Sequence, residues 1–359
     1  MNALEARIAA LIVAQGPISV AQFMTLALHD AEGGYYATRQ PFGAAGDFIT
    51  APEISQMFGE MLGLWCVQVW HDQGQPKQKR LLELGPGRGT LTADALRAAK
   101  AAPEFLIGLE VVLIEASPVM QKAQAEKLKD CGVAIRWASH FDDRLADRPL
   151  FVLANEFFDA LPVRQYVKTE QGWRERMVVA KGESLEFALA PMPTPAALIP
   201  ASRATAPDGG AYEVSPAATA LAESVARAVA EKGGGALFLD YGYGEEAGFG
   251  ETLQAVGEHQ FADLLAEPGE VDLSAHVDFT ALSEAARHGG AAVYGPRPQG
   301  AFLADLGITA RAEQLITANP GAAAALLKAV ARLIHPDQMG NLFKALAIVP
   351  RSAAPPPGF

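Results

Sequence analysis

Residues 81–90 restrict the possible folds of this chain more than any other stretch. They read Leu-Leu-Glu-Leu-Gly-Pro-Gly-Arg-Gly-Thr. The apolar start predicts a buried strand, and Gly85, Gly87 and Gly89 predict a tight turn whose backbone a ligand can approach closely. Residues 90–99 predict a helix that points its free N–H groups and positive dipole end at that turn. The sequence therefore predicts a strand, a turn and a helix that together bind a small ligand.

Similar strand-like runs recur through the middle of the chain. They are short, apolar and rich in β-formers, and helix-compatible segments separate them, which is the pattern of buried parallel strands in an α/β sheet. The runs are 81–84, 111–115, 133–137, 150–154 and 236–240. We therefore expect an α/β fold built on a Rossmann-like sheet.

The spacing of these runs also predicts the domain organisation. About 80 residues separate the fourth run from the fifth, which is too many for one crossover. Within them, 163–168, 173–179 and 185–189 predict an antiparallel meander, and a helix follows. We expect an N-terminal helical segment on the substrate side at 1–75, an α/β domain at 76–350 with an insertion at 160–232, and a disordered, proline-rich tail at 351–359.

The glycine spacing distinguishes two classes of cofactor. A nicotinamide-dinucleotide turn has the form G-x-G-x-x-G, but here the third glycine comes one residue early and Thr90 takes its place. The form G-x-G-x-G after an acidic residue is instead typical of methyltransferases that use S-adenosylmethionine. Glu115, which ends the next run, can accept both ribose hydroxyls of an adenosine. The predicted cofactor-binding residues are Glu83, Gly85, Pro86, Gly87, Gly89, Glu115 and Asn155.

A third signal follows the fourth run, where residues 153–162 read Leu-Ala-Asn-Glu-Phe-Phe-Asp-Ala-Leu-Pro. Asn155, Glu156 and Asp159 lie within five residues of one another. Clustered carboxylates repel one another unless a cation lies between them. Many methyltransferases place an acidic or amide residue, an aromatic residue and a proline here, beside the reactive methyl group.

Seven stretches together resemble one family, that of the mitochondrial complex I assembly methyltransferase and its bacterial relatives. The stretches are 46–60, 83–90, 155–162, 213–216, 240–244, 272–279 and 339–344. The resemblance runs from about residue 8 to residue 349. It implies a class I methyltransferase fold with an elaborated substrate side, S-adenosyl-L-methionine as cofactor and a protein substrate. For the mitochondrial member it implies methylation of an arginine on a complex I subunit. We see no transit peptide, so we expect a cytoplasmic, bacterial member.

An arginine acceptor poses a chemical problem, because its guanidinium stays protonated at neutral pH. Carboxylates could hold it through paired hydrogen bonds and localise its charge on one side. The candidates are Glu53, Glu156, Asp159, Asp240 and Asp272, and we favour Glu53 and Glu156. Glu53 is equally well explained as a first-turn carboxylate that satisfies a helix dipole. His276 is either a catalytic base or a helix-entry residue.

Composition argues against other classes of function. The net charge of −12 disfavours a large nucleic-acid interface, and no apolar run approaches the ~20 residues that a membrane helix needs. The two cysteines and seven histidines lack metal-ligand spacing, so we expect no metal site. Two alternatives stay open: an assembly factor that binds the cofactor without catalysis, and an NAD-dependent oxidoreductase, which the glycine spacing disfavours. The oligomeric state is left open.

Overall fold

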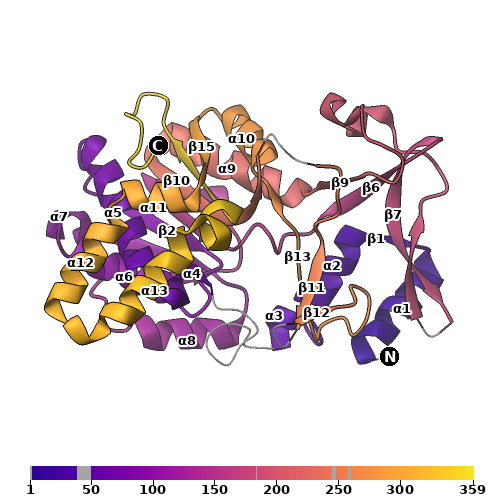
Figure 1. Cartoon of the computed structure of the whole chain (residues 1–359), viewed down its shortest axis with the longest axis horizontal. Helices are drawn as coiled ribbons and strands as arrows, with labels where there is room; N and C mark the ends of the chain where they lie inside the picture. Colours follow the sequence, from indigo (N-terminus) through magenta and orange to yellow (C-terminus); the bar gives the residue numbers. More distant parts are fainter. Residues whose placement is uncertain (1, 39–49, 183, 245–247, 258–259) are drawn as a thin grey trace.

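The computed structural model describes residues 2–38, 50–182, 184–244, 248–257 and 260–359. Two bodies lie side by side, a larger one on an eight-stranded sheet and a smaller one on a five-stranded sheet (Figure 1). A three-stranded sheet and the N-terminal helices complete the smaller body.

The larger sheet has the order β15-β16-β10-β5-β2-β3-β4, and β14 pairs with β10. The five runs expected to form parallel strands do so, which confirms the Rossmann-like fold. The order reverses between β2 and β5, and ligands bind at the carboxyl ends of strands at such a point. The strands are β2 (Lys79–Leu84), β3 (Leu109–Ile114), β4 (Ala134–Ala138), β5 (Leu150–Asn155), β10 (Gly234–Tyr243), β14 (Val277–Asp278), β15 (Ala292–Pro298) and β16 (Phe343–Val349).

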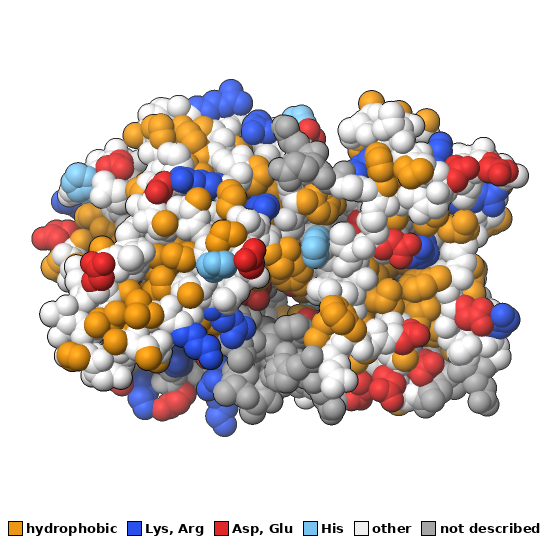
Figure 2. All heavy atoms as spheres, viewed as in Figure 1, with side chains coloured by type: hydrophobic (Ala, Val, Ile, Leu, Met, Phe, Trp, Pro, Cys, Tyr) orange, Lys and Arg blue, Asp and Glu red, His pale blue; other side chains and the backbone are white. Residues whose placement is uncertain are grey.

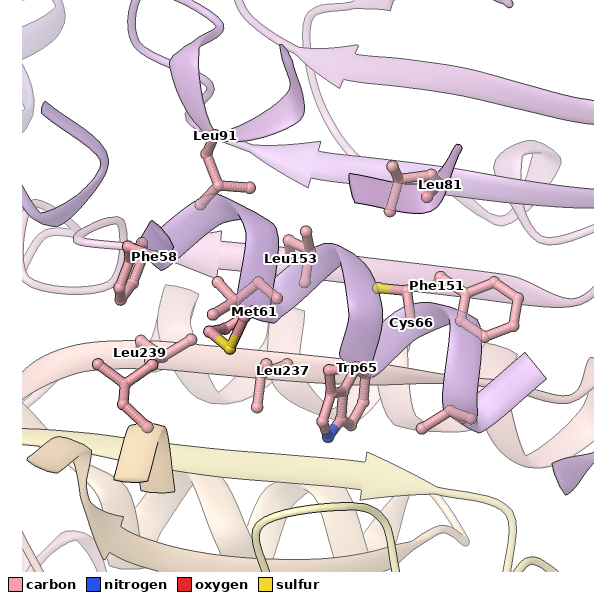
Figure 3. Close-up of a cluster of buried hydrophobic side chains, with 14 of the residues drawn as sticks. Phe58, Met61, Trp65, Cys66, Leu81, Leu91, Phe151, Leu153, Leu237 and Leu239 are labelled. Atoms are coloured by element: carbon pink, nitrogen blue, oxygen red, sulfur yellow. The ribbon is translucent and has the colours of Figure 1, made fainter. Parts of the chain in front are cut away.

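Helices cover both faces of this sheet. One face carries α5 (Gln56–Asp72), α6 (Thr90–Ala99), α8 (Pro118–Leu128), α11 (Gln299–Asp305), α12 (Ile308–Ala318) and α13 (Ala323–Ile334), and the other carries α9 (Pro216–Lys232) and α10 (Phe279–His288). Figure 3 shows how α5 is buried: Met61 and Trp65 lie against Leu153 and Leu237 of the strands beneath. Burying each such side chain contributes about 1.5–3 kcal/mol, so α5 belongs to the core.

The smaller body joins segments that are far apart in the chain. The predicted meander is confirmed as β6 (Arg164–Thr169), β7 (Gly172–Lys181) and β8 (Ser184–Leu189), and β9 (Ala211–Val214) and β1 (Ile18–Ser19) extend it. The helices α1 (Ala3–Gln15) and α2 (Val20–His29) share a core with this sheet and with β11 (Gln254–Gly257) and β13 (Asp272–Ser274). The strand β12 (Gln260–Ala262) pairs with β11.

The structure divides the chain differently from the ranges expected above. Within 1–75, α1 and α2 pack in the smaller body, whereas α5 packs on the larger sheet. Within 160–232, α9 also packs on the larger sheet, because its apolar face is buried against β5 and β10. Two short helices, α3 (Tyr35–Thr38) and α4 (Ala51–Ile54), precede α5. Residues 46–49 of the 46–60 stretch lie outside the described residues.

The prediction of a disordered tail at 351–359 is wrong. The Phe359 ring packs on Phe302 with centroids 5.2 Å apart, and the Gly358 carbonyl accepts a hydrogen bond from Arg297. Prolines lower the chain entropy that ordering must overcome, and one terminal aromatic ring supplies the apolar contact. The composition of the tail therefore misled the prediction.

Candidate active site

The site begins at the carboxyl ends of β2 and β5, which pair in parallel with Leu84 opposite Ala154. A small pocket of about 30 Å³ lies there, lined by the glycine turn together with Glu53, Asn155 and Glu156. The structure thus brings together residues that the sequence separates by up to about one hundred positions.

The glycine turn needs glycine for two reasons. Gly85, Gly87 and Gly89 have φ of +62°, +50° and +78°, in the left-handed region that side chains disfavour. A Cβ on Gly85 would also lie 2.8 Å from the Phe157 ring. Gly89 is the N-cap of α6 and has no side chain that could cap the N–H groups of the first turn. The start of the helix therefore presents free N–H donors and a positive dipole end at the pocket.

Glu83 lies under the turn and is only 3% exposed. Its carboxylate accepts hydrogen bonds from the hydroxyl and the backbone N–H of Thr92 in the first turn of α6. Burial raises the pKa of Glu83 to about 7, although these bonds oppose the shift. The acidic residue of the motif thus ties β2 to α6.

Glu115 follows β3 and faces the glycine turn through one bridging side chain, Gln124. The Gln124 amide donates to the Gly87 carbonyl at 2.7 Å and to Glu115 Oε2 at 3.1 Å. The indole of Trp137 in turn donates to Gln124 Oε1 at 2.8 Å. Burial raises the pKa of Glu115. The sequence reasoning missed Gln124, because a glutamine inside a helix carries no signal of its fully buried position.

Glu156 and Glu53 hold α4 against the larger sheet. The backbone N–H of Ala51 donates to Glu156 Oε1 at 3.0 Å, and the Asn155 amide donates to the same oxygen at 3.1 Å. The Thr90 hydroxyl donates to Glu53 Oε1 at 2.6 Å. Glu156 has φ of +50°, a strain of order 1–3 kcal/mol for a residue with a side chain, and such strain clusters at functional sites. Burial raises its pKa to about 7.

Asp240 anchors the loop that leaves β5. Its Oδ2 accepts hydrogen bonds from the backbone N–H groups of Phe157, Phe158 and Asp159 at 3.1, 2.9 and 3.3 Å. The side chain is fully buried, and burial, together with the charges of Asp159 and Glu156, raises the pKa of Asp240. The strained loop is therefore held by a neighbouring strand.

A second group of carboxylates lies where the two bodies meet. The Tyr241 hydroxyl donates to Asp159 Oδ2 at 2.7 Å, and the Tyr36 hydroxyl donates to Asp272 Oδ1 at 2.9 Å. The two pairs are near enough that the charges of both aspartates raise the pKa of Tyr36, after burial. Burial raises the pKa of Asp159 to about 6. The roles of Tyr36 and Tyr241 were missed, although Tyr241 lies in one of the matched stretches.

His276 lies apart from the cofactor-side pocket. Its ring makes an edge contact with Tyr241, with centroids 5.5 Å apart, and burial lowers its pKa. It lines a separate cavity of about 220 Å³ together with Arg203 and Glu213. Figure 2 shows a hollow between the two bodies with histidine and acidic side chains at its edge. The predicted catalytic residues therefore divide between two places.

The residues of the first pocket fit a cofactor that carries both a cation and an anion. Asn155 Oδ1 is buried without a hydrogen-bond partner among the described residues, so it can accept a donor such as an ammonium group. The free N–H groups that remain at the start of α6 can donate to a carboxylate. An amino-acid moiety carries both groups.

The described residues offer neither a metal site nor a membrane-spanning helix. No group of three histidine, cysteine or acidic residues there could hold a metal ion. No helix among those residues has both the length and the apolar character needed to span a bilayer.

Comparison with known proteins shows the family. Residues 61–297 match the family model of S-adenosyl-L-methionine-dependent methyltransferases. The Danio rerio protein named protein arginine methyltransferase NDUFAF7, mitochondrial, is 37% identical over 95% of this chain and 86% of its own length. The Homo sapiens protein of that name is 36% identical over 94% of this chain and 81% of its own.

A solved structure agrees with this result. It is a COG1565 superfamily protein from Burkholderia thailandensis bound to S-adenosyl-homocysteine, with a TM-score of 0.87 and 28% identity over 99% of this chain and 94% of that one. Structure and sequence thus lead to one class of enzyme and one cofactor. This chain belongs to the S-adenosyl-L-methionine-dependent methyltransferase family, and S-adenosyl-L-methionine is its cofactor.

Proposed function

We propose that this enzyme methylates the guanidinium group of an arginine side chain in another protein, a respiratory complex I subunit or its bacterial counterpart. The observation that carries the proposal is the set of relatives named protein arginine methyltransferase, two of which match 94–95% of the chain at 36–37% identity. The buried carboxyl groups of Glu156, Asp159 and Asp240 support it, because a bound guanidinium would stabilise their ionised forms and donate hydrogen bonds to them as a paired cation.

The cofactor supplies an electrophilic methyl group on a sulfonium, so the protein has to align the acceptor nitrogen and receive a proton. A bond forms between that nitrogen and the methyl carbon, the bond from carbon to sulfur breaks, and the nitrogen loses one proton. In this proposal Glu83, Gly85, Pro86, Gly87, Gly89, Glu115 and Asn155 hold the cofactor. Glu156, whose pKa is raised to about 7, can exchange a proton near neutral pH.

The structure supports a changed role for Glu53. Its carboxylate already accepts the Thr90 hydroxyl, so we propose that it positions the first turn of α6 against α4. His276 contacts Tyr241 and lies away from the first pocket, so we propose that it lines the approach to the acceptor side.

The deciding experiment compares the proteome of cells with and without this gene by mass spectrometry. We expect one or a few methyl-arginines to disappear, and a copy of the gene that encodes the active enzyme to restore them. An unchanged set of methyl-arginines would contradict the proposal and favour an assembly factor that binds the cofactor without catalysis.

Fractionation of the same cells tests the expected cytoplasmic location.

A further inference from the structure

Asp159 has one carboxylate oxygen that the protein does not use. Its Oδ2 accepts the Tyr241 hydroxyl, and the backbone N–H groups of Ala160 and Asp159 also stabilise the carboxylate, but Oδ1 is buried and meets no hydrogen-bond partner among the described residues. The residue is only 8% exposed. A buried acceptor without a donor is unfavourable, and native proteins leave few such atoms unless a ligand or water meets them.

The surroundings of this oxygen are acidic. Besides burial, the charge of Asp159 raises the pKa of both Glu156 and Asp240. The Tyr36–Asp272 pair of the smaller body also lies near enough for Asp159 to raise the pKa of Tyr36. Among the described residues, Glu156, Asp159 and Asp240 form no ion pair, and the charge of Arg332 lowers the pKa of Glu156 less than burial raises it. The region therefore holds three carboxyl groups without an ion-pair partner among the described residues and one free acceptor, and a cation with N–H donors would stabilise their ionised forms.

The other carboxylates are already committed to donors from the protein. Asp240 Oδ2 binds three backbone N–H groups, and Oδ1 accepts the N–H of Tyr241. Glu53 Oε1 accepts a hydrogen bond from the Thr90 hydroxyl, and Glu156 Oε1 accepts one from the backbone N–H of Ala51. Each of these carboxylates therefore already accepts at least one hydrogen bond from the protein, whereas Asp159 Oδ1 is a buried acceptor that meets none among the described residues.

We propose that Asp159 binds the guanidinium group of the acceptor arginine through Oδ1, with Tyr241 as the positioning residue that fixes the carboxylate through Oδ2. The proposal rests on the arginine-methylating function proposed above and names the residue that selects its acceptor. Tyr241 is well placed for this role because the Ser274 side chain also hydrogen-bonds to its hydroxyl, which restrains it from the smaller body. The Asp159 carboxylate is therefore oriented by a tyrosine of the larger body that a serine of the smaller body restrains.

The test is a binding measurement on the full chain saturated with S-adenosyl-homocysteine. The probe is agmatine, an alkylguanidinium, titrated at millimolar concentrations by calorimetry. N-carbamoylputrescine, which has the same chain and the same ammonium group but a neutral urea in place of the guanidinium, is the matched ligand control. We expect agmatine to bind and the urea not to bind, because the urea lacks the charge and one pair of donors.

The matched variants are Asp159→Asn and Asp94→Asn. Asp94 is a similarly buried carboxylate on α6, 7% exposed and ion-paired with Arg97, so its replacement controls for the loss of a buried charge. In Asp159→Asn the amide oxygen can still accept the Tyr241 hydroxyl while the NH₂ faces the guanidinium. We expect agmatine affinity to fall at least about 30-fold in Asp159→Asn and to stay within two-fold in Asp94→Asn.

Tyr241→Phe keeps the proposal testable if Asp159→Asn folds poorly. It leaves the carboxylate in place, and we expect a loss of only a few-fold, with S-adenosyl-homocysteine binding unchanged. Equal agmatine affinity in wild type and Asp159→Asn, or no agmatine binding to wild type, would overturn the proposal. If the binding test fails but methyl-arginines disappear on gene deletion, arginine methylation stands and the guanidinium binds elsewhere. If no methyl-arginine disappears, the proposed arginine-methylating function is itself contradicted.

Discussion

The two bodies build their halves of the site in different ways. In the larger body, each cofactor-side feature is a contiguous stretch at the end of a strand, as in residues 83–90 between β2 and α6. In the smaller body, the core draws on α1, α2, the meander and β13, which lie far apart in the chain. The Tyr36–Asp272 hydrogen bond joins residues 236 positions apart. Local chemistry can be read from contiguous motifs, whereas contacts between distant segments depend on the tertiary fold.

The largest effect on cofactor affinity should follow from a substitution in the glycine turn of the larger body, where the site is built from one contiguous stretch. Gly87→Val puts a branched side chain at φ of +50°, where the cofactor is expected to meet the backbone. We expect S-adenosyl-homocysteine affinity to fall by about two orders of magnitude or more, measured by calorimetry. Gly132→Val is the control, because its φ is +78° and a Cβ there meets no atom within 4 Å. Equal losses in both variants would mean that backbone strain, and not contact with the cofactor, causes the effect.

Glu156→Gln tests a residue that lies between the cofactor-side pocket and the acidic groups near the smaller body. Glutamine keeps an oxygen for the Ala51 N–H but removes the charge. We expect cofactor affinity within a few-fold and methyl transfer reduced by about 100-fold, on the scale of ~3 kcal/mol of transition-state stabilisation. Transfer of radiolabelled methyl groups to the identified acceptor measures it. Transfer at the wild-type rate would make Glu156 a structural residue of the strained loop.

Glu83 gives the larger body a predicted dependence of stability on pH. Its pKa is about 7 in the folded state and near the ordinary value of 4.5 when unfolded, so the folded state binds the extra proton between these values. The contribution is therefore fully present below about pH 4.5 and is lost as the pH rises to about 7 and beyond. We expect this loss to be on the order of 3 kcal/mol.

Urea unfolding of the wild type and of Glu83→Gln at several pH values measures that contribution. As the pH rises from about 4.5 to 7, the unfolding free energy of the wild type should fall relative to that of the variant. Outside that range the difference between the two should stay constant. A constant difference over that range would show that the carboxylate does not hold a proton in the folded state.

The smallest effect should be confined to the other body. Ser19 caps α2 through a reciprocal pair of hydrogen bonds with Gln22. Ser19→Ala should lower stability by about 1 kcal/mol. Hydrogen exchange should quicken in α2, while S-adenosyl-homocysteine affinity stays within two-fold. A marked loss of cofactor affinity would show that the two halves are more tightly coupled than the comparison implies.

The features that could be predicted from the sequence lie in contiguous segments, and those that could not are contacts between distant segments. The parallel strands, the glycine turn and the meander were predictable, because each depends on the periodicity and turn chemistry of a short segment. The bridging role of Gln124 and the pairing of Tyr241 with Asp159 were not, since no local pattern specifies which distant group a side chain meets. The short strands β11 and β13 were missed because a few residues give too little alternation to detect.

The pairing of β1 with β7 also affects how the chain folds during synthesis. Ile18 and Ser19 hydrogen-bond with partners about 160 residues later, and α1 and α2 bury their apolar faces against those same later segments. A ribosome that adds roughly 5–20 residues per second needs on the order of ten to thirty seconds to produce those partners. For that interval Phe23 and Met24, both buried in the finished protein, have only the N-terminal helices to pack on and lack the later strands of their core. The nascent N-terminal helices are therefore a point of aggregation risk, and a chaperone that shields short apolar helices would raise the yield of folded enzyme.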